Sequence, residues 1–163
     1  MPAAWWLVRR RSGRPAYPYA LDILLVMPFL IDVVGNALDL YDTVEAWDDL
    51  NHLVNWALLT AAFGQLLLRL PVPRLAALGL GIGFGAVTAV LWELAEYVTF
   101  IRNSPELETA YTDTLGDLTL GLCGSVVAAL VTVTLLWPRA ADGRSRSAPD
   151  AAGSRARRAR RGA

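Results

Sequence analysis

The chain has 163 residues, with 15 basic residues that are all arginines, 15 acidic residues and one histidine, so its formal net charge is zero. Hydrophobic residues make up 55% of the sequence, which excludes intrinsic disorder as the main state. Cys123 is the single cysteine, which excludes a disulfide-stabilised secreted scaffold. The length fits one domain.

Four stretches are long and apolar enough to cross a lipid bilayer as helices, which takes roughly 20 residues each. They lie at about 19–38, 50–70, 75–100 and 114–137. The third and fourth contain long cores without a charge, Leu75–Trp92 and Leu118–Trp137. The period-two alternation of strands is absent. The sequence therefore predicts an all-α, polytopic membrane protein with a bundle of four transmembrane helices.

The arginines indicate the orientation of this bundle. Four of them precede the first helix, Arg69 and Arg74 flank the turn between the second and third helices, and eight follow the fourth helix. Only Arg102 lies on the other side. Because short cytoplasmic segments carry the excess of arginine, both termini are expected in the cytoplasm.

Three regions follow from this division of the chain. Residues 1–18 form a basic cytoplasmic segment, residues 19–137 form the transmembrane domain, and residues 138–163 form an Arg-rich cytoplasmic tail that we expect to be disordered. The tail could contact anionic lipid or RNA, but the simpler interpretation is a solvated segment that fixes the topology. The lipid bilayer is the expected partner, and no nucleic acid is expected.

Acidic residues are concentrated where a membrane protein least favours them. Thirteen of the 15 lie between Asp22 and Asp117, in or between the predicted helices. Helical spacing pairs many polar side chains on one face of each helix, at the ends predicted to face outward. These pairs are Asp32 with Asn36, Asp48 with His52 (Asn55 follows one turn later), Glu93 with Glu96 (Tyr97 follows), and Asp113 with Asp117.

Such a cluster requires a positive partner. An ionisable group inside a membrane helix costs about 2.5 kcal/mol or more, and Arg102 is the only basic residue at this end. Some carboxylates must therefore bind protons, a metal ion or a cationic ligand. Carboxylates with one imidazole suit Zn, Fe or Mn, and oxygen ligands alone suit Mg or Ca. The predicted metal ligands are Asp48, His52, Glu93, Glu96, Asp113 and Asp117, and the predicted further polar residues are Asp32, Asn36, Asn55 and Tyr97.

Helix capping is an alternative explanation for part of this set. Asp48 or Asp49 could cap the second helix, and Thr114-x-x-Asp117 has the form of a capping box. Capping does not explain Glu93 and Glu96, which lie near a helix C-terminus, where the helix dipole disfavours acids.

Small residues predict close helix packing. The spacings Gly81-x-x-x-Gly85 and Gly121-x-x-x-Ser125 let neighbouring backbones approach within membrane helices. Pro28 predicts a kink in the first helix.

Three segments resemble the YjdF-like family of bacterial inner-membrane proteins: WDDLNHL at Trp47–Leu53, LWELAEYV at Leu91–Val98 and DTLGDL at Asp113–Leu118. Typical members carry more N-terminal membrane helices than this chain. More distantly the chain resembles VanZ-like proteins, which are linked to glycopeptide-antibiotic resistance, although Glu96 and Gly121 stand where those proteins carry Gln and Asn. The resemblance implies a shared site and brings no activity with it. The family pattern falls on Asp48, His52, Glu93, Glu96, Tyr97, Asp113 and Asp117.

Three functions fit these features. The first is a metal-dependent membrane hydrolase or transferase that acts on a lipid or envelope substrate. The second is a cation- or proton-binding component of a transport or membrane complex, which would need a homo-oligomer or a partner because four helices are few for a transporter. The third is a structural membrane partner whose buried polar network holds helices together.

Overall fold

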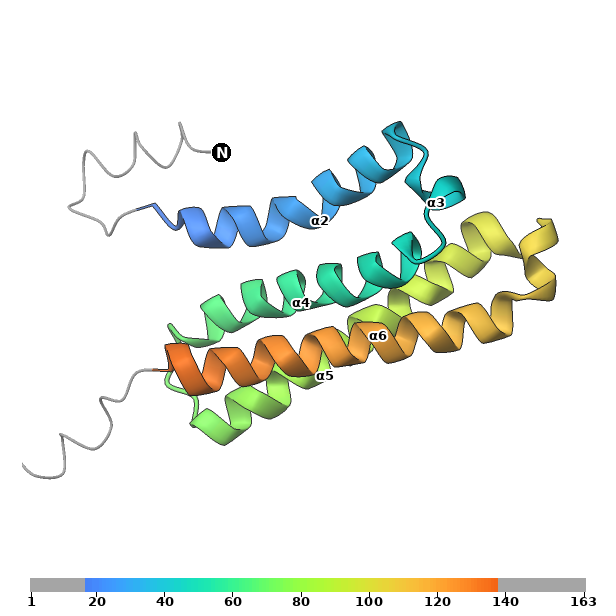
Figure 1. Ribbon diagram of the computed structural model, residues 1–163. Coiled ribbons are helices and arrows are strands. Elements are labelled where there is room, and N and C mark those ends of the chain that lie inside the picture. Colours follow the sequence, from blue (N-terminus) through green and yellow to red (C-terminus); the bar gives the residue numbers. More distant parts are fainter. Residues whose placement is uncertain (1–16, 138–163) are drawn as a thin grey trace, which may run out of the picture.

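The computed structural model describes residues 17–137, which form helices and no strand. Four long helices, α2 (Tyr19–Ala37), α4 (Trp47–Leu67), α5 (Arg74–Glu96) and α6 (Ala110–Val131), run alternately in opposite directions (Figure 1). Short helices α3 (Leu40–Thr43) and η2 (Pro105–Glu108) lie in the connections, and the π-helical turns η1 (Tyr97–Ile101) and η3 (Thr132–Leu136) extend α5 and α6. The Arg-rich tail and nearly all of the basic N-terminal segment lie outside the described residues.

The predicted all-helical architecture is confirmed, but two helices begin earlier than expected. α4 begins at Trp47 rather than at residue 50, and α6 begins at Ala110 rather than at residue 114. Asp48 and Asp49 therefore lie in the first turn of α4, and Asp117 lies inside α6. The N-terminus of neither helix carries a side-chain cap, so the capping explanation of these carboxylates is wrong.

Three helical segments are long and apolar enough to cross a membrane: Tyr19–Ala37, Arg74–Ile101 and Ala110–Leu136. Large apolar side chains on them face outward, and Phe29, Leu75 and Leu135 are each more than two-thirds exposed. α4 has 21 residues but is not among these candidates. Polar residues such as Asn51 and His52 lower its hydropathy, so three of the four predicted spans meet the criterion of length and composition.

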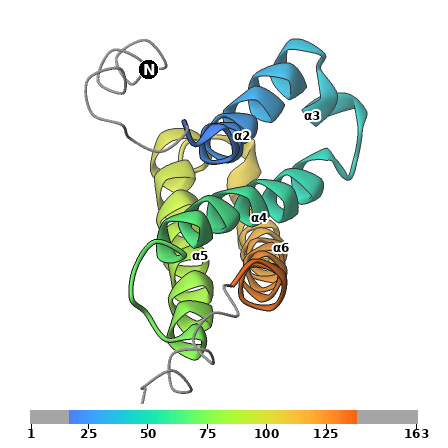
Figure 2. The ribbon, with the colours of Figure 1, turned by 90° about the vertical axis from the view of Figure 1, so that its left-hand side faces the viewer.

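α4 lies at the centre of the bundle. It makes its most extensive contact with α6, and it also packs against α5 and, on its other side, against α2 (Figure 2). The central position explains why α4 can carry polar residues, because neighbouring helices cover much of its surface. Pro28 lies inside α2, whose axis changes direction along its length in Figure 1, as expected for a proline that removes a helical hydrogen bond.

Glycines let α4, α5 and α6 approach closely. A Cβ at Gly124 of α6 would overlap the carbonyl oxygen of Leu53 on α4. A Cβ at Gly85 of α5 would overlap the Ser125 side chain, and one at Gly81 would lie 3.1 Å from the Cβ of Ala129. The predicted role of these small residues in close packing is confirmed, and this packing brings the polar ends of the three helices together.

Candidate metal centre

α4 and α6 begin, and α5 ends, at the same end of the bundle (Figure 1). Polar side chains from these three helices meet there. α4 supplies Asp48 and His52, which lie one turn apart on one face. α5 supplies Glu93 and Glu96, and α6 supplies Asp117. The helical spacing explains each pair, while the glycine-mediated packing explains why the three helices place these side chains together.

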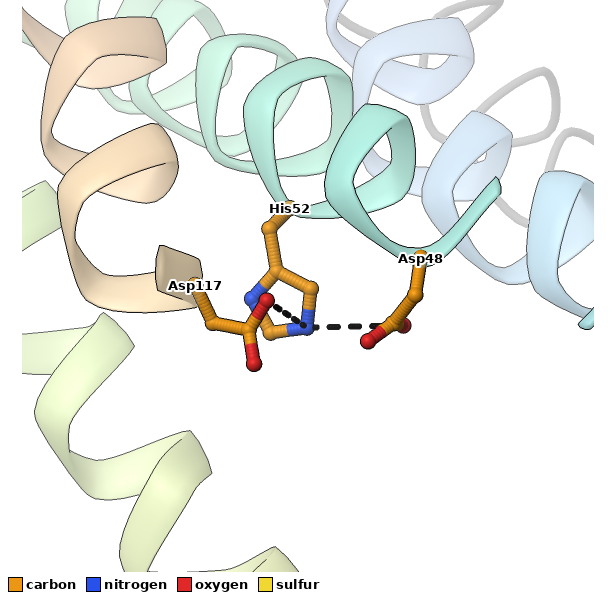
Figure 3. A group of neighbouring side chains, drawn as sticks. All are labelled: Asp48, His52 and Asp117. Carbon is orange, nitrogen blue, oxygen red and sulfur yellow. Dashed lines mark ion pairs between the residues drawn. The ribbon is translucent and has the colours of Figure 1, made fainter. Parts of the chain in front are cut away.

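The Nε2 edge of the His52 ring faces two carboxylates. Its Nε2 atom lies 3.8 Å from Oδ1 of Asp48 and 3.8 Å from Oδ1 of Asp117 (Figure 3). Both separations are too long for N–H···O hydrogen bonds. Two ligands of one tetrahedral zinc ion lie about 3.4 Å apart, so each of these two separations is close to that between metal ligands.

The Nδ1 edge of the same ring faces Glu93. The Nδ1 atom lies 3.6 Å from Oε1 of Glu93, and the side chains of His52 and Glu93 are only 7% and 6% exposed. Neither of these two atoms has a hydrogen-bond partner among the described residues. Leaving a buried polar atom unpaired costs about 1–3 kcal/mol, so this edge of the ring needs a proton or a cation between the two atoms.

Two overlapping groups of side chains have the composition and spacing of a metal site. Asp48, His52 and Asp117 form one group, and His52, Glu93 and Glu96 form the other, with the ligand atoms of each group within 4.8 Å of one another. The Asp48 side chain is 47% exposed, whereas that of Asp117 is 5% exposed. Each group therefore has one partly exposed carboxylate, Asp48 in the first and Glu96 in the second, beside two buried residues.

No arginine neutralises this cluster within residues 17–137, where every ion pair of the cluster involves His52. Arg102 follows α5 at this end of the bundle, but its side chain is exposed. One imidazole faces four carboxylates, and like charges in a poorly solvated site repel one another strongly. The arrangement therefore suits a multivalent cation.

Other predicted site residues lie outside the two groups. Asp113, one turn before Asp117, is exposed and belongs to neither group. Tyr97 in η1 is 47% exposed. The Oδ1 atom of Asn55, one turn beyond His52 on α4, is buried without a hydrogen-bond partner in the described part of the chain. Asn55 therefore lies next to the cluster along the helix but in neither group of ligands.

A hydrogen-bond network links α2 and α3 to α4 beside the cluster. The Nδ2 atom of Asn36 donates to the backbone oxygen of Asp32 at 3.0 Å and to its Oδ1 at 3.3 Å. The Tyr41 hydroxyl donates to the same Oδ1 at 2.8 Å and accepts from Nδ2 of Asn51 at 2.7 Å. Burial and the bond to Asp32 raise the pKa of Tyr41, so its hydroxyl keeps its proton at neutral pH.

A family profile described as "Predicted membrane protein (DUF2238)" matches residues 3–137, which include every described helix. The chain belongs to this family. The description agrees with the three helical segments that can cross a membrane, and it is consistent with the resemblance to the YjdF-like family. No curated protein and no solved structure matches the chain.

In this member of the DUF2238 family, sequence reasoning found the polar cluster but missed two residues beside it. Tyr41 and Asn51 complete the network that begins at Asp32 and Asn36. Asn51 could have been found, because an amide inside a predicted membrane helix indicates a buried polar contact. Tyr41 had no such signal, because its partners lie 9 and 10 residues away across a turn.

Proposed function

We propose that this member of the DUF2238 family binds a divalent metal ion through Asp48, His52 and Asp117. The observation that carries the proposal is the convergence of two carboxylates from α4 and α6 on Nε2 of the only histidine in the chain, 3.8 Å away in each case. Imidazole and carboxylate ligands suit Zn, Fe or Mn, and Mg is a weaker match because it favours oxygen ligands.

We further propose that α4 is a fourth transmembrane helix and that both termini lie in the cytoplasm of a bacterial inner membrane. In support, α4 runs alongside α5 and α6, and both ends of the described segment lie at one end of the bundle (Figure 1). Arg69 and Arg74 flank the turn at that end, and Arg102 lies at the other. The positive-inside rule then places the metal ligands near the outer face.

A metal at this position has a chemical use. Three protein ligands leave a coordination position for water or substrate, which is the arrangement of catalytic rather than structural zinc sites. A metal ion there would polarise a carbonyl or phosphoryl group and activate a bound water molecule. The half-exposed side chain of Asp48 supports access from outside the bundle. The proposed activity is hydrolysis or group transfer on a lipid or envelope substrate at the outer leaflet.

A second candidate function is a cation- or proton-binding component of a transport or membrane complex. One observation favours it: Oδ1 of Asn55 and Oγ1 of Thr60, further along α4 from the site, are buried without a hydrogen-bond partner among the described residues. Polar groups inside a membrane bundle often mark an ion pathway. This function would require a homo-oligomer or a partner, because four helices offer little room for a pathway.

Metal content tests the proposal. The full chain is purified in detergent, loaded separately with Zn, Mn, Fe and Mg, and its bound metal is measured by mass spectrometry after exchange into metal-free buffer. We expect one ion per chain in the parent protein and a loss of that ion in His52→Ala and Asp117→Asn. Asp113→Asn is the matched control, since Asp113 is an exposed carboxylate one turn away on α6, and it should retain the ion.

Two results would contradict the metal site. One is the absence of bound ion in the parent protein with all four metals. The other is equal metal content in the parent protein, His52→Ala and Asp117→Asn. If those variants lose thermal stability in metal-free buffer while no variant changes metal content, the third alternative, a structural polar network, gains support instead.

A further inference from the structure

The two edges of the His52 ring differ in their access to the surroundings. Nδ1 and Oε1 of Glu93 are both buried, and both lack a hydrogen-bond partner within residues 17–137. The Nε2 edge faces Asp48, whose side chain is 47% exposed. The Nε2 edge is therefore the more accessible of the two to an incoming cation and its water ligands.

A neutral imidazole carries one proton, on one of its two nitrogens. If Nε2 offers its lone pair to a metal, the proton must lie on Nδ1 and needs an acceptor. Oε1 of Glu93 is the carboxylate atom that the structure places at this edge, 3.6 Å away. A closure of well under 1 Å would bring the two atoms to hydrogen-bond distance and would satisfy both buried atoms at once.

We propose that Glu93 is a positioning residue, which accepts a hydrogen bond from the Nδ1–H of His52 and thereby directs the Nε2 lone pair toward a divalent cation held with Asp48 and Asp117. The inference rests on the proposed metal site, and it divides the carboxylates predicted as metal ligands by role. Asp48 and Asp117 contact the ion, whereas Glu93 acts through the imidazole. Carboxylates behind a ligating histidine fix its ring orientation and raise its basicity.

The competing arrangement places a cation at the other edge of the ring. His52, Glu93 and Glu96 also have the spacing of metal ligands, so a cation there would use Nδ1 and both glutamates. The burial of Nδ1 and of Oε1 of Glu93 argues against it, because a hydrated cation would have to lose its water to reach these two atoms, although Glu96 is partly exposed. The two arrangements differ in which nitrogen carries the proton, and that difference is measurable.

Heteronuclear NMR of the full chain in detergent micelles gives this information directly. Because the chain has a single histidine, isotope-labelled histidine yields ring-nitrogen signals from His52 alone. We expect a protonated Nδ1 with and without zinc, and a zinc-induced change at Nε2. A protonated Nε2 with the zinc-induced change at Nδ1 would overturn the proposal. Zinc-induced changes that show metal on both nitrogens would overturn it as well.

Glu93→Gln tests the contribution of the negative charge. A glutamine can still accept from Nδ1–H through its carbonyl oxygen, so the tautomer should persist. The metal affinity should fall by about 10- to 100-fold, with one ion per chain still bound at saturating zinc. Asp113→Asn is again the control: Asp113 is exposed and belongs to neither group of ligands, so its variant should lower the affinity less than Glu93→Gln does and should leave the NMR signals unchanged. Complete loss of the ion in a folded Glu93→Gln protein would identify Glu93 as a ligand and overturn its positioning role.

The outcomes separate this inference from the proposed function. If the chain binds no metal while Nδ1 remains protonated, the metal site fails and only the hydrogen bond stands. If the chain binds metal through Nδ1, the metal function stands and the role of Glu93 as a positioning residue fails. Should Glu93→Gln not fold, as judged by circular dichroism and gel filtration, the NMR experiment on the parent protein still decides between the two edges.

Discussion

His52 illustrates how one side chain can organise several carboxylates. Its ring lies between Asp48 and Asp117 on one edge and Glu93 on the other, at 3.6–3.8 Å. Replacing any one carboxylate leaves the others in place, so the effects of such variants will not be additive. The distinct roles that we propose for the two edges therefore need measurements on His52 itself.

Tyr41 is a second residue with a testable role. Tyr41→Phe removes the acceptor of the Asn51 amide, which is 4% exposed, and the donor to Asp32. A buried donor left unpaired costs about 1–3 kcal/mol, so the variant should lower the free energy of unfolding by that amount. Reversible unfolding in detergent measures it.

The control for this variant is Tyr111→Phe. Tyr111 is 79% exposed, and its hydroxyl forms no hydrogen bond within the described segment. The control should therefore match the parent protein. Equal stability of Tyr41→Phe and Tyr111→Phe would show that the Tyr41 network does not hold α2 and α3 to α4.

Sequence reasoning at the residue scale succeeded where contacts follow helical periodicity. The spacing of Asp48 and His52 predicted a shared face, and the structure brings them together with Glu93, Glu96 and Asp117. Sequence reasoning could not separate Asp113 from Asp117, because their spacing places both on one side of α6. Only their burial in the structure distinguishes them. The orientation of the His52 ring depends on packing between helices, which no single helix encodes.

At the scale of helices, the contact between α4 and α6 depends on a glycine, which has no side chain to hold the two backbones apart. Gly124→Ala would place a Cβ against the carbonyl oxygen of Leu53, a backbone atom that cannot rotate away. We expect this variant to separate α4 from α6 and to destabilise the protein by about 1–3 kcal/mol. Because Asp48, His52 and Asp117 lie on these two helices, the variant should also weaken metal binding.

Gly116→Ala is the matched substitution on the same helix. A Cβ at Gly116 would meet no atom within 4 Å, so alanine should be neutral or stabilise α6 by up to about 1 kcal/mol. Thermal unfolding and zinc affinity of both variants test the contact. A Gly124→Ala protein as stable as Gly116→Ala would show that the close approach of α4 and α6 is not required.

For α4, hydropathy alone is insufficient to decide whether a helix belongs to a transmembrane bundle. Its length was predicted, but its polar residues lower its hydropathy below that of α2, α5 and α6. Contacts with α2, α5 and α6 bury residues such as Asn51, His52 and Thr60. A helix in the centre of a bundle need not be apolar on all sides, since its neighbours replace lipid.

For the whole molecule, the zero net charge conceals a separation of charge. In the sequence, 14 of the 15 arginines precede α2, flank the connection between α4 and α5, or follow α6. Most acidic residues of the described segment lie toward the end of the bundle where α4 and α6 begin. The described part of the chain offers Arg102 alone as a basic residue at that end. A cation that enters with its own charge would compensate the clustered carboxylates, which is the central claim of the proposed function.

X-ray absorption spectroscopy on the zinc-loaded full chain tests this claim most directly, because it reports the atoms bound to the metal. We predict one imidazole nitrogen and carboxylate oxygens around the ion, with the imidazole signal retained in Asp113→Asn and in Glu93→Gln at saturating zinc. A zinc ion surrounded by oxygen alone would contradict the account, since His52 would then not be a ligand.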